Sequence, residues 1–175
     1  LHDAPQVVAD LGDAAISVFS LAVAVLIGAT TLHRELEMKT ILPLLARPIR
    51  RAEYLTGKYL GTVLVVAVFI MAEGGLVLMM CAGMSGRSPL QVVGVGALLA
   101  AAALLFAWRS PRARTSLPIP WAAAMMLAGA LLAGSGPTDR SLVLASSTLT
   151  LCEVGIVAAI AMLFSSFSTP FLSSL

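Results

Sequence analysis

Long apolar runs separated by short polar connections dominate this sequence. Five such runs can be marked, at residues 14–32, 59–82, 90–108, 119–133 and 142–164. A helix needs about twenty mostly apolar residues to cross the hydrocarbon core of a bilayer, so four of the runs are long enough for a full crossing. The run at 119–133 has only about fifteen residues, which predicts a tilted, locally thinned or re-entrant segment.

A transmembrane crossing must satisfy its backbone hydrogen bonds internally, because the bilayer core offers no water. We therefore predict an all-α, polytopic helical membrane protein with about five membrane segments in a single transmembrane domain over residues 1–175. The composition agrees, since 59% of the residues are hydrophobic and 11% are charged, whereas soluble domains carry about 25% charged residues. Residues 1–13 contain three aspartates and no Lys or Arg, which favours an extracytoplasmic lead-in to the first crossing.

The most basic stretch of the chain, residues 33–58, connects the first two apolar runs and contains six of the eleven Lys and Arg residues. Such an excess of positive charge marks the cytoplasmic side of a membrane protein. With this stretch inside, nine of the eleven basic residues fall on the cytoplasmic side, and two, Arg87 and Arg140, fall outside. The count supports the orientation throughout the chain.

The basic stretch has its own predicted structure. Leucine and isoleucine recur at roughly helical spacing over residues 31–45, which predicts a helix there. Pro48 disfavours the helical conformation at Arg47, so this helix should end or bend nearby. A second, short helix is expected to restart after Ile49 and to lead into the next crossing. We call residues 33–58 the elbow.

From Glu35 to Gly61 the chain reads ELEMKTILPLLARPIRRAEYLTGKYLG, and residues 161–175 read AMLFSSFSTPFLSSL. Both stretches resemble the permease subunit of ABC-2-type ABC transporters. In that family the matching elbow is a coupling helix that docks on a separate ATP-binding subunit. The resemblance implies that ATP and magnesium bind to that partner, that this chain binds no cofactor, and that two permease copies pair as a homodimer or a heterodimer.

The resemblance also bears on the extent of the chain. It implies further membrane segments before Leu1 and after Leu175, so we expect a longer permease. The runs at 90–108 and 119–133 depart from the compact family pattern, although two added crossings leave the sidedness of later segments unchanged.

The residues expected to contact the ATP-binding subunit follow from the same resemblance. They are the charged and turn-forming positions of the elbow: Glu35, Glu37, Lys39, Thr40, Arg47, Pro48, Arg50, Arg51 and Lys58. Another interpretation is that Arg50 and Arg51 bind anionic membrane lipid, which contributes about 1 kcal/mol for each residue near the surface.

Two carboxylates lie deep within the predicted crossings, Glu73 and Glu153. An acid at this depth costs several kcal/mol unless it is protonated, paired or facing water, so it is a candidate functional group. Both glutamates are candidates to line a translocation pathway. Alternatively, each is a neutral acid that hydrogen-bonds to a neighbouring helix, for instance through Ser147, Thr148 or Thr150.

Motifs for other chemistry are missing from the sequence. It has no GxxxxGK[ST] phosphate loop, no HExxH or CxxC metal motif, and no aromatic platforms among its basic residues, so it predicts neither an ATPase site, a metal site nor nucleic acid binding. We predict a multi-pass permease subunit of the inner (plasma) membrane, not itself an enzyme, that couples ATP hydrolysis by its partner to export. The alternatives are a membrane-embedded enzyme using Glu73 or Glu153, and a non-catalytic scaffold that recruits a cytoplasmic partner.

Overall fold

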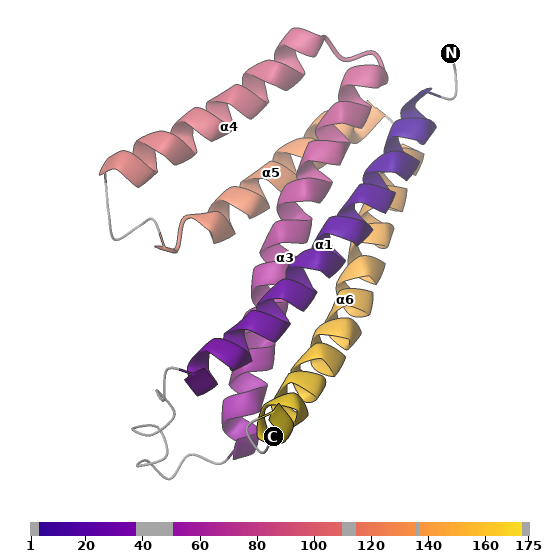
Figure 1. The fold of residues 1–175 in the computed structure, drawn as a ribbon. Coiled ribbons are helices and arrows are strands. Elements are labelled where there is room, and N and C mark those ends of the chain that lie inside the picture. Colours follow the sequence, from indigo (N-terminus) through magenta and orange to yellow (C-terminus); the bar gives the residue numbers. More distant parts are fainter. Residues whose placement is uncertain (1–3, 38–50, 110–114, 136, 173–175) are drawn as a thin grey trace. The chain divides into compact units, whose positions relative to one another are not determined.

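The computed structural model describes residues 4–37, 51–109, 115–135 and 137–172, and every regular element within these ranges is a helix (Figure 1). This confirms the prediction of an all-α protein. The elements, in chain order, are α1 (Ala4–Glu37), α3 (Arg51–Met84), α4 (Pro89–Arg109), α5 (Pro118–Leu132), the short 3₁₀ helix η2 (Ala133–Ser135) and α6 (Pro137–Leu172).

Four of these helices contain a stretch that is long and apolar enough to cross a membrane. The stretches are Gln6–Gly28, Glu53–Met84, Pro89–Arg109 and Arg140–Phe164. Helix α5 is also apolar but has only 15 residues, so it rises about 22 Å, against a hydrocarbon core of about 30 Å. The chain is therefore a polytopic helical membrane protein, with α5 as a shorter apolar segment.

The first membrane helix begins earlier than the sequence analysis placed it. Asp10 and Asp13 were assigned to a lead-in, whereas the structure has both within α1 and within the candidate span Gln6–Gly28. Apolar residues such as Val7, Val8 and Leu11 surround them, and isolated aspartates do not end a helix whose flanking residues favour burial in lipid.

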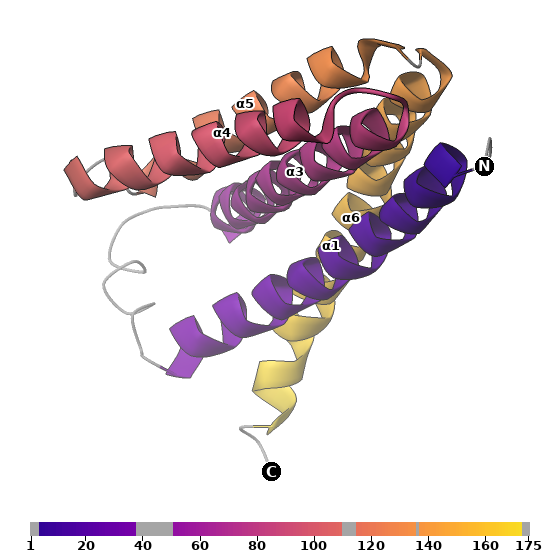
Figure 2. The same ribbon diagram turned by 90° about the horizontal axis from the view of Figure 1, so that it is seen from above.

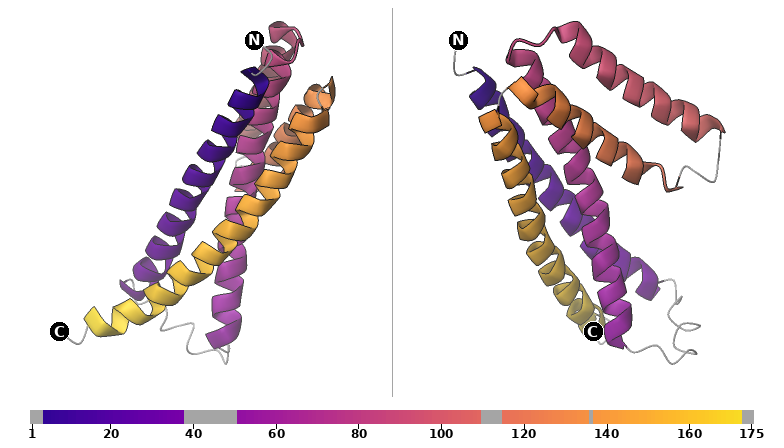
Figure 3. Two further views of the ribbon diagram at one scale, coloured as in Figure 1. Left: turned by 90° about the vertical axis from the view of Figure 1, so that its right-hand side faces the viewer. Right: turned by 180° about the vertical axis from the view of Figure 1, so that it is seen from behind.

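The part of the elbow after Ile49 also differs from its prediction. A short helix separate from the next crossing was expected after Ile49, but α3 runs without a break from Arg51 to Met84 (Figure 3). Glu53 lies in its first turn, where a carboxylate interacts favourably with the helix dipole. Of the helix predicted over residues 31–45, the structure describes the part up to Glu37, the last residue of α1. Residues 38–45 lie outside the described ranges.

The short connection from α3 to α4 requires a glycine. Gly86 has a φ of 95°, a left-handed conformation that glycine adopts without steric cost. The amide of Ser85 donates to the carbonyl of Cys81 at 2.9 Å, and the hydroxyl of Ser85 donates to the same carbonyl at 2.8 Å. These bonds satisfy a backbone acceptor at the end of α3.

The helices pack in two units. The first consists of Leu1–Val18 and Ala67–Thr150, and the second of Phe19–Val66 and Leu151–Leu175. Helices α1, α3 and α6 therefore each contribute one part to each unit, and α4 and α5 belong entirely to the first. We describe the two units separately.

Close backbone contacts at glycine hold the first unit together. A Cβ placed on Gly75 of α3 would lie 2.6 Å from the carbonyl carbon of Met125 in α5, and a Cβ on Gly129 of α5 would lie 2.6 Å from the carbonyl oxygen of Gly75. A Cβ on Gly12 of α1 would lie 2.6 Å from a methyl group of Val77 in α3. Small residues permit such close helix contacts in membranes.

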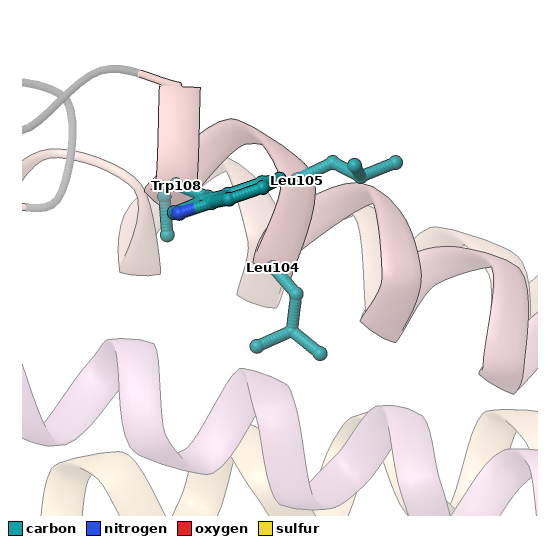
Figure 4. A pocket seen from close by; sticks show the side chains of 4 residues that line it. Leu104, Leu105 and Trp108 are labelled. Atoms are coloured by element: carbon teal, nitrogen blue, oxygen red, sulfur yellow. The ribbon is translucent and has the colours of Figure 1, made fainter.

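Helix α4 differs from its neighbours in the first unit because it has no buried residue. It contacts α5, which runs in the opposite direction beside it (Figure 2). Leu104, Leu105 and Trp108 lie exposed at its C-terminal end (Figure 4). Trp108 is followed by Arg109, an aromatic and basic pair that is typical of a helix end at the membrane–water interface.

The second unit is built from the remaining parts of α1, α3 and α6. Ala24, Val66 and Ala158 are among its buried apolar residues. A Cβ on Gly28 of α1 would lie 3.3 Å from the Cβ of Ala161 in α6. This contact between small residues sets a short distance between α1 and α6 within the unit.

Candidate functional site

The structure describes the two ends of the elbow. The candidate span of α1 ends at Gly28, but the helix continues to Glu37, which adds about 13 Å of helix beyond the span. Glu35 and Glu37 lie in the last turn of α1, and Arg51 is the first residue of α3. The other predicted contact residues of the elbow, Lys39, Thr40, Arg47, Pro48 and Arg50, lie outside the described residues.

Lys58 lies about two turns after the start of α3. Its Nζ is 5.6 Å from the centroid of the Tyr54 ring, one helical turn earlier, which is within range of a cation–π interaction. The hydroxyl of Thr62 donates to the carbonyl oxygen of Lys58 at 3.1 Å. The ammonium group of Lys58, the last residue of the elbow, is therefore held against the side of α3.

A hydrogen bond joins the beginning of α3 to α6 within the second unit. The hydroxyl of Tyr59 donates to the carbonyl oxygen of Gly155 at 3.2 Å. A Cβ on Gly155 would lie 3.4 Å from the same hydroxyl oxygen, an ordinary van der Waals distance. A tyrosine hydroxyl at an intramembrane helix contact stabilises the pair, since an unpaired hydroxyl in hydrocarbon is costly.

Glu73 is half-buried on α3 in the first unit, and its Oε2 atom is fully shielded from solvent. The next residue, Gly74, faces α6, because a Cβ placed there would lie 3.2 Å from the Oγ of Ser147. Glu73 is therefore adjacent to the contact of α3 with α6, as expected for a carboxylate directed to the interior of a membrane protein.

The hydroxyl groups proposed as partners of the glutamates make other hydrogen bonds. Ser147 donates to the carbonyl of Val143 at 2.7 Å, and Thr148 donates to the carbonyl of Leu144 at 2.8 Å. Thr150 shares a hydrogen bond of 3.4 Å with Ser17 of α1. Two of the three hydroxyls thus donate their proton to a carbonyl of α6 itself.

Glu153 has a different environment, because its side chain is exposed on α6. It belongs to the second unit, whereas Glu73 belongs to the first. The structure therefore distinguishes the two carboxylates by burial, and a pathway shared by both stays a prediction.

Sequence reasoning also missed Asp13, a carboxylate on the buried side of α1 within the candidate span Gln6–Gly28. It lies on the buried side of α1, four residues after Ala9 and three before Ile16, which are both buried. Its Oδ1 atom is buried and has no hydrogen-bond partner among the described residues. The spacing of Ala9, Asp13 and Ile16 on one helical face is the signal that could have identified it.

Asp13 and Glu73 lie near the same contact between α1 and α3. Asp13 follows Gly12, which meets Val77, and Glu73 precedes Val77 by one turn. The first unit thus contains two carboxylates close to one helix crossing. Within the residues that the structure describes, no group of His, Cys, Asp and Glu side chains is arranged to hold a metal ion.

The family comparison matches nearly the whole chain. A family model described as ABC-2 family transporter protein covers residues 3–171. The chain belongs to this family. The match confirms the resemblance seen in the elbow, and it includes α4 and α5, which the sequence analysis treated as a departure from the family pattern. Comparisons with curated proteins and with solved structures gave no match.

Membership of the ABC-2 transporter family and the four candidate spans make this chain a membrane-embedded permease subunit of an ABC transporter.

Proposed function

We propose that this permease subunit couples ATP hydrolysis by a separate ATP-binding subunit to the movement of substrate across the membrane, and that the elbow is the contact. The supporting observation is that α1 and α3, which flank the elbow, are single helices of 34 residues each. Each helix runs unbroken from the elbow through a candidate span. A displacement of the elbow therefore acts directly on the end of each span that adjoins it.

Helix α6 takes part in the same movement. The hydrogen bond from Tyr59 to the carbonyl of Gly155 connects the beginning of α3 with α6 inside the second unit. A displacement of the elbow would therefore be transmitted from α3 to α6, since the hydrogen bond joins residues more than ninety positions apart in the chain.

The remaining parts of the proposal are made by analogy with the family. ATP and magnesium bind to the partner, and no cofactor binds to this chain, whose sequence has no GxxxxGK[ST] loop. Two permease copies pair in the inner (plasma) membrane with the elbow on the cytoplasmic side, and transport is export, by analogy with the family.

Purification of the full-length permease together with the ATP-binding subunit encoded nearest to it tests this proposal. We expect a stable complex and ATP hydrolysis that a transported substrate accelerates in proteoliposomes. A turnover that persists without the partner would instead indicate a membrane-embedded enzyme. Binding of the partner without nucleotide-dependent movement would indicate a scaffold, and either result contradicts the proposal.

Replacement of Glu73 by glutamine is expected to lower the transport rate about tenfold, which corresponds to about 1.4 kcal/mol of barrier. Glu73 has an oxygen shielded from solvent, and the next residue, Gly74, lies at the α3–α6 contact, so its charge or proton is placed among the helices rather than on their outer surface. The exposed Glu153 should matter less. Transport in proteoliposomes is compared for Glu73→Gln, Glu153→Gln and the exposed control Asp10→Asn.

Assembly with the ATP-binding subunit should be unchanged in all three variants, because none of these side chains lies in the elbow. A wild-type transport rate in Glu73→Gln would show that this carboxylate is a structural group. A larger loss of transport rate in Glu153→Gln than in Glu73→Gln would assign the pathway to Glu153 instead.

A further inference from the structure

The buried face of α1 carries three polar side chains. Asp13, Ser17 and Ser20 follow one another at helical spacing, so they lie on one face of this helix. Their neighbours Ile16 and Ala24 on the same face are buried. We call Asp13, Ser17 and Ser20 the α1 polar stripe. The proposed function uses the elbow end of α1 but assigns nothing to this stripe.

Two oxygen atoms of the stripe are buried and have no hydrogen-bond partner among the described residues. They are Oδ1 of Asp13 and Oγ of Ser20, and the Ser20 side chain is 0% exposed. A buried polar atom without a partner costs free energy, because it has lost its hydrogen bonds to water. Two such atoms on one face of a membrane helix are explained if a ligand contacts that face during transport.

A second carboxylate lies at the same helix contacts in the first unit. The hydroxyl of Ser17 shares a hydrogen bond of 3.4 Å with that of Thr150 in α6. Gly12, the residue before the stripe, meets Val77 of α3. Glu73 precedes Val77 by four residues, so it lies on the face of α3 that meets α1. Carboxylates from two helices therefore belong to one contact region.

The two carboxylates lie well inside the membrane. Asp13 is seven residues after the start of the candidate span Gln6–Gly28, and Glu73 is eleven residues before the end of the candidate span Glu53–Met84. These separations correspond to about 10 Å and about 16 Å along the helix axes, within a hydrocarbon core of about 30 Å.

The interior of the membrane segments contains acidic side chains but no basic ones. No Lys, Arg or His occurs in the apolar stretches at residues 6–28, 59–84, 90–108, 118–132 and 141–164. These stretches therefore provide no basic side chain that could neutralise the carboxylates. A ligand with its own positive charge would neutralise them and would satisfy the buried oxygens of the stripe.

We propose that the α1 polar stripe lines the translocation pathway and selects substrates that carry a positive charge on an apolar body, with Asp13 facing the charge. This inference rests on the proposed function, since it names the class of substrate that the permease moves. The buried apolar residues Ile16 and Ala24 beside the stripe suit the apolar body. Among the residues that the structure describes, no group of side chains is arranged to hold a metal ion, which favours an organic over an inorganic cation.

The stripe is closed in this structure. A Cβ on Gly12 would lie 2.6 Å from a methyl group of Val77, so α1 packs directly on α3 beside Asp13. A separation of α1 from α3 would open the stripe to a substrate. A displacement of the elbow acts on the ends of these same two helices, so it is suited to produce that separation.

Two hydrophobic ions of the same shape and opposite charge test the inference. Binding of tetraphenylphosphonium, the cation, and tetraphenylborate, the anion, is measured by equilibrium dialysis. The full-length permease is held in phosphatidylcholine nanodiscs, and binding to empty nanodiscs is subtracted. The wild type is expected to bind the cation saturably and to show no saturable binding of the anion.

Two variants assign the selectivity to the stripe. Asp13→Asn should weaken tetraphenylphosphonium binding at least about tenfold, because an interaction with a charged group is lost, whereas Asp13→Glu should preserve most of it. Ser20→Ala should weaken binding about threefold. It should unfold at the wild-type temperature or above, because the hydroxyl that it removes has no partner among the described residues. A loss of binding without a loss of stability separates a role in selectivity from a structural role.

Two matched controls exclude general effects. Asp10→Asn removes the same charge from an exposed position of α1, and Thr148→Val removes a hydroxyl group from an exposed position of α6. Both variants should bind tetraphenylphosphonium as the wild type does. A loss in Asp10→Asn as large as that in Asp13→Asn would overturn the inference, because it would reflect only the overall charge of the protein.

Three further results would also overturn it. They are equal binding of the two ions by the wild type, no saturable binding of either ion, and wild-type affinity for the cation in both Asp13→Asn and Ser20→Ala. Ser20→Ala keeps the test informative where Asp13→Asn does not fold. Binding is measured without the ATP-binding subunit, so normal cation binding without coupling to ATP hydrolysis would count against the proposed function alone.

Discussion

An Arg51→Glu variant is expected to lose at least about tenfold in substrate-stimulated ATP hydrolysis and to co-purify poorly with the ATP-binding subunit. Arg51 is the first residue of α3 and lies within the elbow, the proposed contact with the partner, where an acidic residue of the partner is its expected counterpart. Reversing the charge would place like charges together, which costs several kcal/mol at an interface. ATP hydrolysis by the reconstituted complex and the amount of partner retained on purification are the two measurements.

The fold of the variant should be intact, which makes the result interpretable. A glutamate in the first turn of a helix interacts favourably with the helix dipole, and Glu53 already occupies that turn. Arg140→Glu is the matched control, because Arg140 lies near the beginning of α6, on the side predicted to be extracytoplasmic, and is exposed. Unchanged coupling in Arg51→Glu, together with weaker binding to anionic vesicles, would assign Arg51 to lipid instead.

A Gly75→Val variant is expected to be destabilised by about 3 kcal/mol or more. A Cβ at this position would lie 2.6 Å from the carbonyl carbon and 2.7 Å from the carbonyl oxygen of Met125. The neighbouring atoms belong to the backbone of α5, so they cannot turn aside as a flexible side chain would. Thermal unfolding in detergent, followed by tryptophan fluorescence, measures the change, since Trp121 lies in α5 itself.

Gly94→Val in α4 is the control for this experiment, because no atom lies within 4 Å of a Cβ placed at Gly94. Both substitutions add the same side chain to a membrane helix. A Gly75→Val protein that unfolds at the same temperature as Gly94→Val would show that α3 and α5 do not approach each other through their backbones.

The sequence was sufficient for the fold class but not for the helix ends. Runs of apolar residues set the number and approximate place of the membrane helices, because burial in lipid depends mainly on local hydropathy. The helix ends depend on a competition between individual polar residues and the apolar residues that surround them. Asp10 and Asp13 suggested a polar lead-in, yet α1 continues through both.

The candidate site was harder to predict for a different physical reason. Glu73 and Glu153 looked alike in the sequence, because each is a single acid within an apolar run. One is half-buried and the other exposed, and this difference depends on which side of a helix its neighbours occupy. Gly74 next to Ser147, and Gly12 next to Val77, are contacts between distant parts of the chain that local spacing does not reveal.

Helix α4, which has no buried residue, offers a practical consequence. Substitutions along it should be tolerated as long as they keep its hydrophobicity and length, so a reporter such as a fluorophore on an engineered cysteine can be attached there without disturbing neighbouring side chains. The native thiol of Cys81 is buried and that of Cys152 is exposed, so labelling would begin from a variant in which Cys152 has been replaced. Paired dyes on α4 and on the elbow would then follow the transport cycle directly.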